Sequence, residues 1–531
     1  MRSDSPAFAT GRGLVPGARR IALVTGSHHE QFYWYATGDD GDRKLAQFPL
    51  GYSLHQQRWL PMQALLLSPP KPPNDMVGGW NLVCFRCHST HGRPRLEGGG
   101  SDPIASHGES RLDTRVTEFG IACEACHGGS REHVETYQNP LRRYASYLGL
   151  TTEAKVVNPA ELDSRGSADV CGSCHSIHHL GFGSDADVAA FNQTGFAFRP
   201  GESLAGKRLI ASWEHRDDPA FAEIVSRSPR FFSDRFWPDG MPAVNGREYN
   251  GLLNTPCFQR GELSCTSCHR MHQAGDDPRG PTEWADDQLD AAKLGNAACN
   301  SCHAKIGKAV EEHTRHDAGS SGSLCYNCHM PNTTYGLLKQ TRSHQVDVPD
   351  VANALATGRP TACNLCHVDA TLAWTAEQLE SGWGRKSPEL DPEHERTSQV
   401  ALEALRGDAG LRAMAAWHLG WQPALEVSGD DWMVPLLAQL LEDPYAAVRH
   451  IAATSLQGRP GFEGFEYDYI APRPEREAAR LEALERWRRS RPDQGRRSDE
   501  AVLMDELSEP QWERIEALLS RRDDTPVFRQ E

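Results

Sequence analysis

Seven copies of one short motif constrain the fold of this chain more than any other feature of its sequence. Fourteen of the fifteen cysteines form CxxC pairs, and a histidine follows each pair immediately. The pairs are Cys84/Cys87, Cys123/Cys126, Cys171/Cys174, Cys265/Cys268, Cys299/Cys302, Cys325/Cys328 and Cys363/Cys366, and the adjacent histidines are His88, His127, His175, His269, His303, His329 and His367. This pattern is the signature of c-type haem attachment, in which both cysteines bond the porphyrin and the histidine binds iron as the proximal ligand.

The repetition of the motif argues against the other common uses of a CxxC pair. Two such pairs complete one tetrahedral zinc site, and nothing then requires a histidine after each pair. Disulfide scaffolds occur in short secreted chains, and a thioredoxin-like redox site normally has a single pair. We therefore expect seven covalently attached haem c groups.

The composition indicates that the chain needs more than its own side chains to fill its interior. It has 531 residues and a mean hydropathy of −0.58, so its apolar cores should be thin and haem would add the missing bulk. The net charge is −16, with lysine and arginine scattered, which argues against a nucleic-acid partner. No apolar run reaches the length of a membrane span, so we expect no transmembrane segment in this chain.

The first residues carry no export signal, although haem c is attached outside the cytoplasm. The apolar run Ile21–Val24 is too short for the core of a signal peptide and is typical of a strand. We therefore expect a periplasmic or extracellular protein with a truncated N-terminus, whose export signal lies upstream of this sequence.

The motifs and the hydrophobic periodicity together predict a mainly α fold, with little regular structure around the haems and minor β structure near the N-terminus. Beyond the last motif, apolar residues recur every three or four positions, which predicts two antiparallel helix pairs of the α-solenoid kind. The expected segments are 1–80, a truncated haem subdomain with short strands; 81–370, a seven-haem cytochrome c domain of short helices and long loops; 371–397, a linker; 398–470, the solenoid helices; and 471–531, charged helices and a tail.

Each haem iron has a second axial position, and its occupant distinguishes an electron carrier from an enzyme. Sixteen histidines remain beyond the seven proximal ones, against nine methionines, the competing ligand that raises the potential. Met271 and Met330 lie beside proximal histidines on the same short turn, from which the opposite ring face is hard to reach. We therefore expect bis-histidine ligation and low potentials.

Three motifs continue as CHxxH, which places a second histidine at His91, at His178 (with His179 alongside) and at His272. Residues three apart on a helical turn point the same way, so such a pair cannot bind one iron from both faces. The second histidine would instead serve a neighbouring haem, or act as a polar turn residue or the partner of a propionate. Further distal candidates are His28 or His29, which follow a strand-like run, His133, which follows the second motif, and His313, His316 and His344, which bracket the sixth.

Several longer stretches resemble a known group of multihaem cytochromes. GSHHEQFYWYATG, QQRWLP, CEACHGGSREHV, PCFQRGELSCTSCHRMH and HTRHDAGSSGSLCYNCHMP followed by RSH are similar to the hydroxylamine oxidoreductase and octahaem cytochrome superfamily, in the branch that carries C-terminal HEAT-type repeats. DPYAAVRHIAATSL resembles the second helix of a HEAT repeat. These stretches recur over most of residues 20–460, so the solenoid helices are expected to be HEAT-like.

The resemblance also bears on the ligands and on the upstream region. It implies distal roles for His28 or His29, His133, His272, His316 and His344, without fixing which haem each one serves. Members of the group often carry another haem motif upstream of the GSHH stretch, and none occurs here. The resemblance therefore implies that the native protein has at least eight haems.

Three functions are compatible with these motifs. The favoured one is electron transfer along closely packed, low-potential bis-histidine haems to or from a redox partner protein, docked through the HEAT-like region. The second is a haem-dependent oxidoreductase of small nitrogen or sulfur oxyanions with one open-coordination haem. Catalytic relatives often mark that haem with CxxCK, which is missing here, and fold kinship alone confers no activity. The third is a scaffold or sensor in which the solenoid has the main role.

Overall fold

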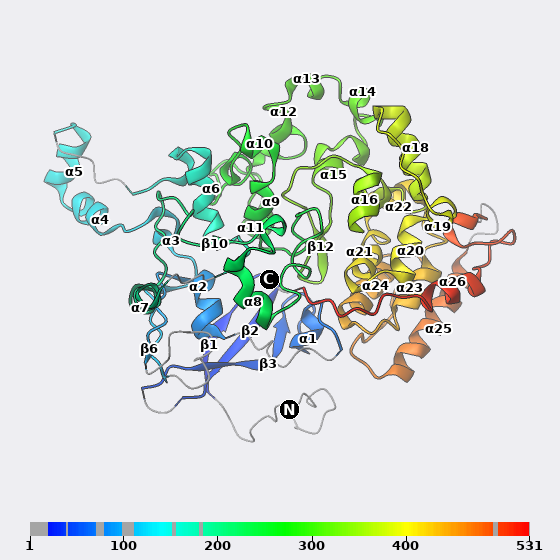
Figure 1. The fold of residues 1–531 in the computed structure, drawn as a ribbon, viewed down its shortest axis with the longest axis horizontal. Coiled ribbons are helices and arrows are strands. Elements are labelled where there is room, and N and C mark those ends of the chain that lie inside the picture. Colours follow the sequence, from blue (N-terminus) through cyan, green and yellow to red (C-terminus); the bar gives the residue numbers. More distant parts are fainter. Residues whose placement is uncertain are drawn as a thin grey trace. The chain divides into compact units, whose positions relative to one another are not determined.

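The computed structural model describes residues 20–38, 41–70, 79–97, 111–150, 156–179, 184–491 and 498–529. The chain divides into two compact units. Figure 1 labels the helices and strands that are described below. The first comprises residues 1–62, 73–210 and 264–266, and the second comprises residues 63–72, 211–263 and 267–531. The protein is mainly helical, with a minor sheet near the N-terminus, in agreement with the coarse prediction from the sequence.

The first unit begins with a four-stranded antiparallel sheet in the order β1-β2-β3-β4. Its strands are β1 (Ile21–Thr25), β2 (Glu30–Ala36), β3 (Leu45–Ser53) and β4 (Arg58–Pro61). β1 and β2 lie where the sequence predicts strands. Trp34 of β2 packs against Trp80, Phe85 and Phe191 to form an aromatic core.

The rest of the first unit consists of short helices and two-residue strands. The helices are a π-helix at Trp80–Cys84, α2 (Phe85–His88), α3 (Cys123–His127), α4 (Arg131–Gln138), α5 (Pro140–Tyr147), α6 (Ser164–Gly172) and α7 (Asp185–Thr194). The strand pairs are β5 (Ser89–Thr90) with β8 (Glu118–Phe119), β6 (Leu96–Glu97) with β7 (Arg111–Leu112), and β9 (His178–His179) with β10 (Leu209–Ile210).

The second unit has short helices around the later motifs. They are α8 (Ala222–Arg227), α9 (Glu248–Leu253), α10 (Pro256–Gln259), α11 (Pro281–Asp287), α12 (Ala297–Asn300), α13 (Ala304–Gly307), α14 (Val310–Thr314), α15 (Cys325–His329), α16 (Val351–Thr357), α17 (Ala362–Cys366), α18 (Leu372–Trp383) and α19 (Pro392–Arg396). A hairpin of β11 (Thr334–Gly336) and β12 (Lys339–Thr341) follows α15, while α1 (Met62–Leu65) follows β4 directly.

A block of helices with a conventional apolar core follows. Its members are α20 (Gln399–Arg406), α21 (Ala409–His418), α22 (Gln422–Ser428), α23 (Val434–Leu440) and α24 (Ala446–Gln457). α20 packs on α21, α23 packs on α24, and the two pairs pack on each other. A buried ion pair, Arg412 Nε to Asp443 Oδ2 at 2.6 Å, joins the pairs. The sequence predicts α20, α21, α23 and α24 as two helix pairs but not α22 between them, and the assignment as HEAT-like repeats stays a prediction.

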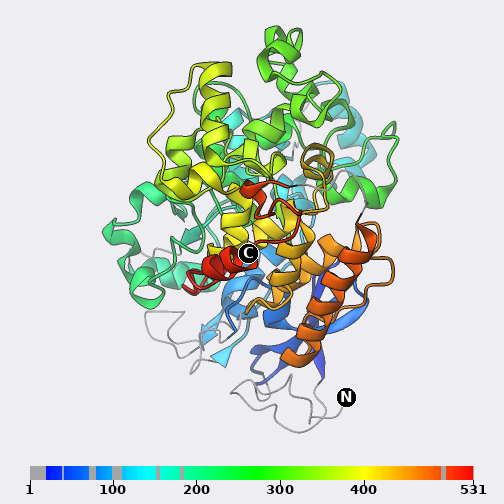
Figure 2. The ribbon, with the colours of Figure 1, turned by 90° about the vertical axis from the view of Figure 1, so that its right-hand side faces the viewer.

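Two more helices and a tail complete the second unit (Figure 2). α25 (Arg473–Ser490) and α26 (Trp512–Leu519) lie close to the two charged segments expected from the sequence. The tail then runs back across the unit, where the backbone N–H of Val527 donates to the Tyr445 hydroxyl at 2.9 Å. The Arg529 N–H donates to the Leu67 carbonyl at 3.0 Å, and its buried guanidinium lies 4.9 Å from the Trp237 ring centroid.

Candidate haem-binding sites

Most of the CxxCH motifs lie on short helical turns that end at or next to the proximal histidine. α2, α3 and α15 have the proximal histidine as their last residue, and α17 ends one residue before it. Cysteines three apart on such a turn point to the same side, as bonding one porphyrin edge requires. In α17, Thr361 caps the turn by accepting from the Asn364 N–H.

The third, fourth and fifth motifs depart from this arrangement, because the second cysteine of each lies beyond the end of its helix. In the fifth motif, α12 stops at Asn300 and Cys302 lies in the turn that follows. The backbone still holds the motif together, since the N–H groups of Cys302 and His303 donate to the Cys299 carbonyl at 3.2 Å and 2.9 Å. The two cysteines therefore share one turn without sharing one helix.

Two of the fourteen motif thiols are exposed. They are Cys302 and Cys123, whereas the other twelve are half-buried. Cys302 lies in the turn after α12. The porphyrin edge bonded there would lie at the surface of the second unit. The role of Cys302 as an attachment residue stays a prediction from its motif.

The helix ends at the first and third motifs correct another expectation from the sequence. The CHxxH argument placed both histidines of each pair on a single helical turn. The chain instead leaves α2 at His88 and enters strand β5, so that His91 adopts a φ of 47°. His178 lies in strand β9 rather than on the turn that carries His175. The premise that His91 and His178 continue the helical turn of their motifs is therefore wrong, because α2 ends at His88 and α6 ends at Gly172.

Thiols of different motifs lie against one another in the first unit. The Cys87 Sγ is 3.8 Å from the Cys174 carbonyl oxygen, and a hydrogen bond between the two thiols, together with burial, raises the pKa of Cys174. The Cys171 thiol hydrogen-bonds the Cys265 thiol, which lowers the pKa of Cys171 to about 7. Haems attached at these cysteines would therefore be close neighbours. These values describe free thiols, and thioether formation removes the titration.

The second unit shows the same adjacency. Burial, the charge of Cys325 and a hydrogen bond to its thiol raise the pKa of Cys299 to about 12, which places the fifth and sixth motifs together. Burial raises the pKa of Cys363 and of Cys366 to about 12, and in both cases the nearby Cys328 contributes in the same direction. The sixth and seventh motifs are therefore also neighbours.

Three proximal imidazoles in the second unit face a second imidazole. The ring centroids of His269 and His344, of His313 and His329, and of His316 and His367 are each 6.2 Å apart. Two imidazoles bound on opposite sides of one metal ion have centroids roughly 6.3 Å apart, because each bond is about 2.0 Å and the ring centre lies about 1.15 Å beyond the nitrogen. The observed separation of 6.2 Å fits one iron between the two rings of each pair.

Hydrogen bonds at the other ring nitrogen orient these imidazoles. Nδ1 of His329 is 2.6 Å from the Asp347 carbonyl oxygen, and Nδ1 of His269 is 2.9 Å from that of Asp287. His316 makes the equivalent contact with the Thr314 carbonyl oxygen at 2.6 Å. An Nδ1–H that donates to a carbonyl leaves Nε2 as the lone-pair nitrogen, which is the tautomer needed for binding iron, and it makes the ligand more basic.

Burial favours the neutral ring that binds a metal. It lowers the pKa of His367, and the facing His316 lowers it further, whereas the nearby Asp369 raises it. Burial also lowers the pKa of His313, with a second contribution from His329. The chain thus provides attachment cysteines and a separation between imidazoles that fit haem c at three motifs.

The other candidate ligands occupy varied surroundings. His28 and His29 lie in the connection between β1 and β2, while His133 lies in α4 with its ring 4.6 Å from that of Tyr137. His179 is buried in β9, and His272 follows the fourth motif in a bend. His127 Nδ1 is 2.6 Å from the Val157 carbonyl oxygen, which repeats the orientation described above. The distal ligands for His88, His127, His175 and His303 stay predictions.

The structure also brings forward one histidine that the family resemblance did not favour and one arginine that the sequence did not single out. His313 brackets the sixth motif in the sequence, but the family resemblance favoured only His316 and His344. Its position three residues before His316 was the available signal. A second such group is Arg359, which forms ion pairs with Asp347 at 2.5 Å and with Asp239 at 2.7 Å.

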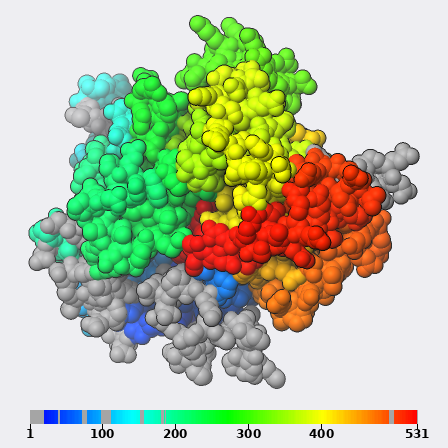
Figure 3. Space-filling model, turned by 45° about the vertical axis from the view of Figure 1, so that its right-hand side comes forward, coloured from blue at the N-terminus to red at the C-terminus, as the bar shows by residue number. Residues whose placement is uncertain are grey.

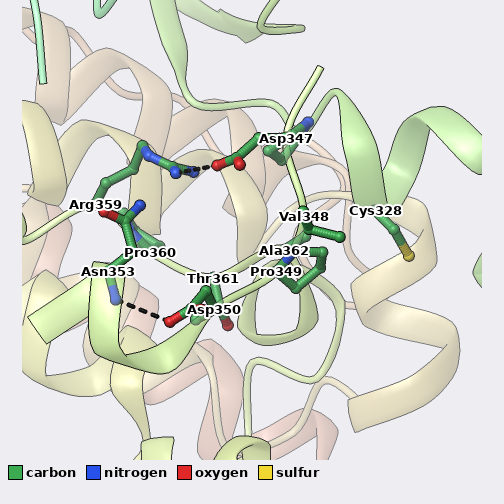
Figure 4. A pocket seen from close by; sticks show the side chains of 11 residues that line it. Cys328, Asp347, Val348, Pro349, Asp350, Asn353, Arg359, Pro360, Thr361 and Ala362 are labelled. Atoms are coloured by element: carbon green, nitrogen blue, oxygen red, sulfur yellow. Dashed lines mark hydrogen bonds and ion pairs between the residues drawn. The ribbon is translucent and has the colours of Figure 1, made fainter. Parts of the chain in front are cut away.

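Arg359 lines a small pocket beside Cys328, together with Asp347, Asp350 and Asn353 (Figure 4). Asp347 is the residue whose backbone carbonyl faces His329 Nδ1, and its N–H donates to the His329 carbonyl at 2.9 Å. Arg359 is buried, with 6% of its surface exposed. Its ion pair with Asp347 holds the loop whose carbonyl orients the proximal histidine His329. No local sequence pattern indicates such a link, because its residues come from three separate segments.

No family model matches the chain, and no curated protein matches it. A similar solved structure is the crystal structure of the outer cell wall cytochrome OcwA, with 17% sequence identity over 81% of this chain and 85% of that chain. The TM-score is 0.40, which is too low to support an inference about function. Within the described part of the chain, no helix is both long and apolar enough to cross a membrane.

Proposed function

We propose that the protein is a multihaem c-type cytochrome that transfers electrons to or from a redox partner protein. The observation that carries this proposal is the set of three imidazole pairs, each 6.2 Å apart and each containing the histidine of a CxxCH motif. Bound haem would supply a reversible one-electron iron centre at each of the seven motifs.

The side chains around the motifs would hold and tune these centres. His344, His313 and His316 would be the distal ligands opposite His269, His329 and His367, respectively. Carbonyl acceptors at Nδ1 make the ligands more basic, which stabilises the oxidised metal and favours low potentials. The contacts between thiols of different motifs support haems close enough for electron exchange within each unit.

The remaining parts of the proposal concern location and partner. Attachment of haem c requires export, so we infer a periplasmic or extracellular protein. The helices α20 to α24 are proposed to be HEAT-like and to dock the redox partner. His28 or His29, His133, His179 and His272 are proposed as the source of the distal ligands for the other haems.

Spin state tests the ligand assignment directly. We expect the ferric exported protein to be fully low-spin by electron paramagnetic resonance and magnetic circular dichroism, and unchanged by nitrite or cyanide. Substituting His344→Ala, His313→Ala or His316→Ala should convert one haem to a high-spin, ligand-accessible form. His394→Ala is the matched control, because His394 pairs with Asp391 at 2.9 Å on the short helix α19.

Two results would contradict the proposal. A colourless protein, or one with the mass of its amino acids alone, would remove the haems. A wild-type high-spin component that responds to nitrite would instead favour the oxidoreductase of small nitrogen or sulfur oxyanions.

A further inference from the structure

A groove rich in arginine lies among α20, α23, α25 and α26 in the second unit. It has a volume of about 740 Å³ and is open to solvent. Figure 3 shows the surface of the orange and red segments that carry α25 and α26. Its lining includes six arginines and three carboxylates: Arg412, Arg473, Arg476, Arg480, Arg488 and Arg522, with Glu442, Asp443 and Glu516. The excess of positive charge stands out in a chain whose net charge is −16.

Half of these arginines are already neutralised by carboxylates. Arg412 pairs with Asp443, Arg480 pairs with Glu442, and Arg522 pairs with Asp524 at 2.7 Å. Arg473, Arg476 and Arg488 form no ion pair with any residue that the structure describes. These three side chains are therefore the positive charges that remain to attract a ligand, and they are hereafter the groove arginines.

Helical periodicity places the groove arginines along one side of α25. Arg473, Arg476, Arg480, Leu484 and Arg488 line the groove, whereas the four glutamates of this helix do not. With a rise of 1.5 Å per residue, Arg473 and Arg488 are roughly 22 Å apart along the helix axis. This length exceeds that of one small anion and matches roughly six or seven residues of extended chain.

Apolar side chains also line the groove. Leu481, Leu484, Ile515, Leu519 and Trp512 line it alongside the arginines, and Leu481 is 55% exposed. Such a mixture suits a ligand that offers both carboxylates and apolar side chains, whereas a polyphosphate would leave these apolar side chains without a partner.

We propose that this groove binds an acidic segment of a partner protein, about six or seven residues long, in which carboxylates alternate with apolar side chains. The carboxylates pair with the groove arginines, and the apolar side chains pack on Leu481 and its neighbours. The inference extends the docking part of the proposed function. Its test involves no electron transfer, so failure of either proposal can be recognised separately.

The test uses the full-length holoprotein and a fluorescent seven-residue peptide of alternating glutamate and leucine. Fluorescence anisotropy at low and high salt should show binding that weakens as salt rises. The triple variant Arg473→Gln, Arg476→Gln, Arg488→Gln should weaken binding by about tenfold or more, because each exposed ion pair is worth up to about fivefold in affinity. The charge-matched control is Arg227→Gln, Arg385→Gln, Arg489→Gln, which lies outside the groove and should stay within about twofold of wild type.

A gain-of-function variant keeps the test decisive if the triple variant folds poorly. Glu516 lines the groove without an ion pair to any described residue, so Glu516→Gln removes a repelling charge and should tighten binding by about twofold. The proposal is overturned if wild type does not bind the peptide, or if the control triple weakens binding as much as the groove triple. Equal binding of polyphosphate or of an oligonucleotide, or self-association that depends on the groove arginines, would also overturn it.

Discussion

Residues 259–330 and residues 398–457 belong largely to the same compact unit but are built in opposite ways. The structure describes every residue from 259 to 330, and in that range the interior holds no aliphatic or aromatic side chain; its buried residues are Ser264, Thr314, Ser323 and Asn327. Between 398 and 457, the helices bury whole faces of alanine and leucine. The first segment carries three haem motifs and the second carries none.

The contrast shows where each segment obtains its stability. Burial of apolar surface contributes about 25 cal/mol per Å², and the helical segment obtains this from its own side chains. The motif segment buries no aliphatic or aromatic side chain against protein. Under the proposed function, the porphyrins attached at its cysteines would supply the apolar core of that segment.

Preventing haem attachment is the strongest way to test this comparison. We expect protein produced without haem attachment to lose the fold of residues 259–330 while α20 to α24 stay helical. Limited proteolysis followed by mass spectrometry should locate the first cleavages in the motif segment. First cleavages within 398–457 instead would contradict the comparison.

A cavity in the helical block should have the next largest effect. Leu437 of α23 is fully buried, so Leu437→Ala should lower the free energy of unfolding by about 2–5 kcal/mol. Thermal unfolding followed by far-ultraviolet circular dichroism measures the loss, and the haem spectrum should remain that of wild type. Val427→Ala, at a residue that is 50% exposed, is the control and should change stability little.

The change in unfolding free energy that pH causes in the same helices should be smaller than the change caused by the Leu437→Ala cavity. Burial raises the pKa of Glu403 in α20 to about 8, although the Gln399 amide donates to its carboxyl and acts in the opposite direction. The folded state therefore favours the protonated carboxyl. We expect this contribution to stability to be full below the ordinary pKa of 4.5 and to be lost as the pH rises through about 8.

The variant Glu403→Gln isolates that contribution. Its unfolding free energy, measured by denaturant titration from pH 5 to pH 9, should lack the decrease that wild type shows. An equal decrease in both proteins would assign the pH dependence to another group.

The smallest predicted effect is a change in the midpoint potential of one haem. It should follow from altering the ion pairs of Arg359 beside the sixth motif. Arg359→Lys keeps the positive charge but loses the geometry that joins Asp347 and Asp239, so the carbonyl facing His329 should shift slightly. We expect a small change in the midpoint potential of one haem in a spectroelectrochemical titration. Arg385→Lys, whose exposed partner is Asp350, should leave all potentials unchanged.

The same contrast explains which features could be predicted from the sequence. The helices of 398–457 follow from a 3.6-residue apolar period, and β1 and β2 follow from short runs of strand-forming residues. The roles of the motif cysteines and of the histidines that follow them stay predictions from a local pattern, whose spacing covalent haem attachment would set. All of these signals lie within a few neighbouring residues.

The distal side of the site could not be predicted in the same way. His344 faces His269 from a loop 75 positions further along the chain, and no periodicity records that approach. The CHxxH expectation failed because it assumed that the helix continues past the proximal histidine, whereas at His88 the chain turns into a strand. The exposure of Cys302 and the link from Arg359 to His329 are likewise products of tertiary structure.

The tail that carries Arg529 has a consequence for how the protein is made. Its backbone pairs with Leu67, so two segments separated by most of the chain close the same unit. During synthesis from the N-terminus, the Leu67 segment is made early. It cannot form its backbone hydrogen bond with Arg529 until residue 529 has been added. A chain that stops before residue 529 should therefore lack this contact with Leu67. We expect proteases to cleave it more readily, even when every haem motif has already been synthesised.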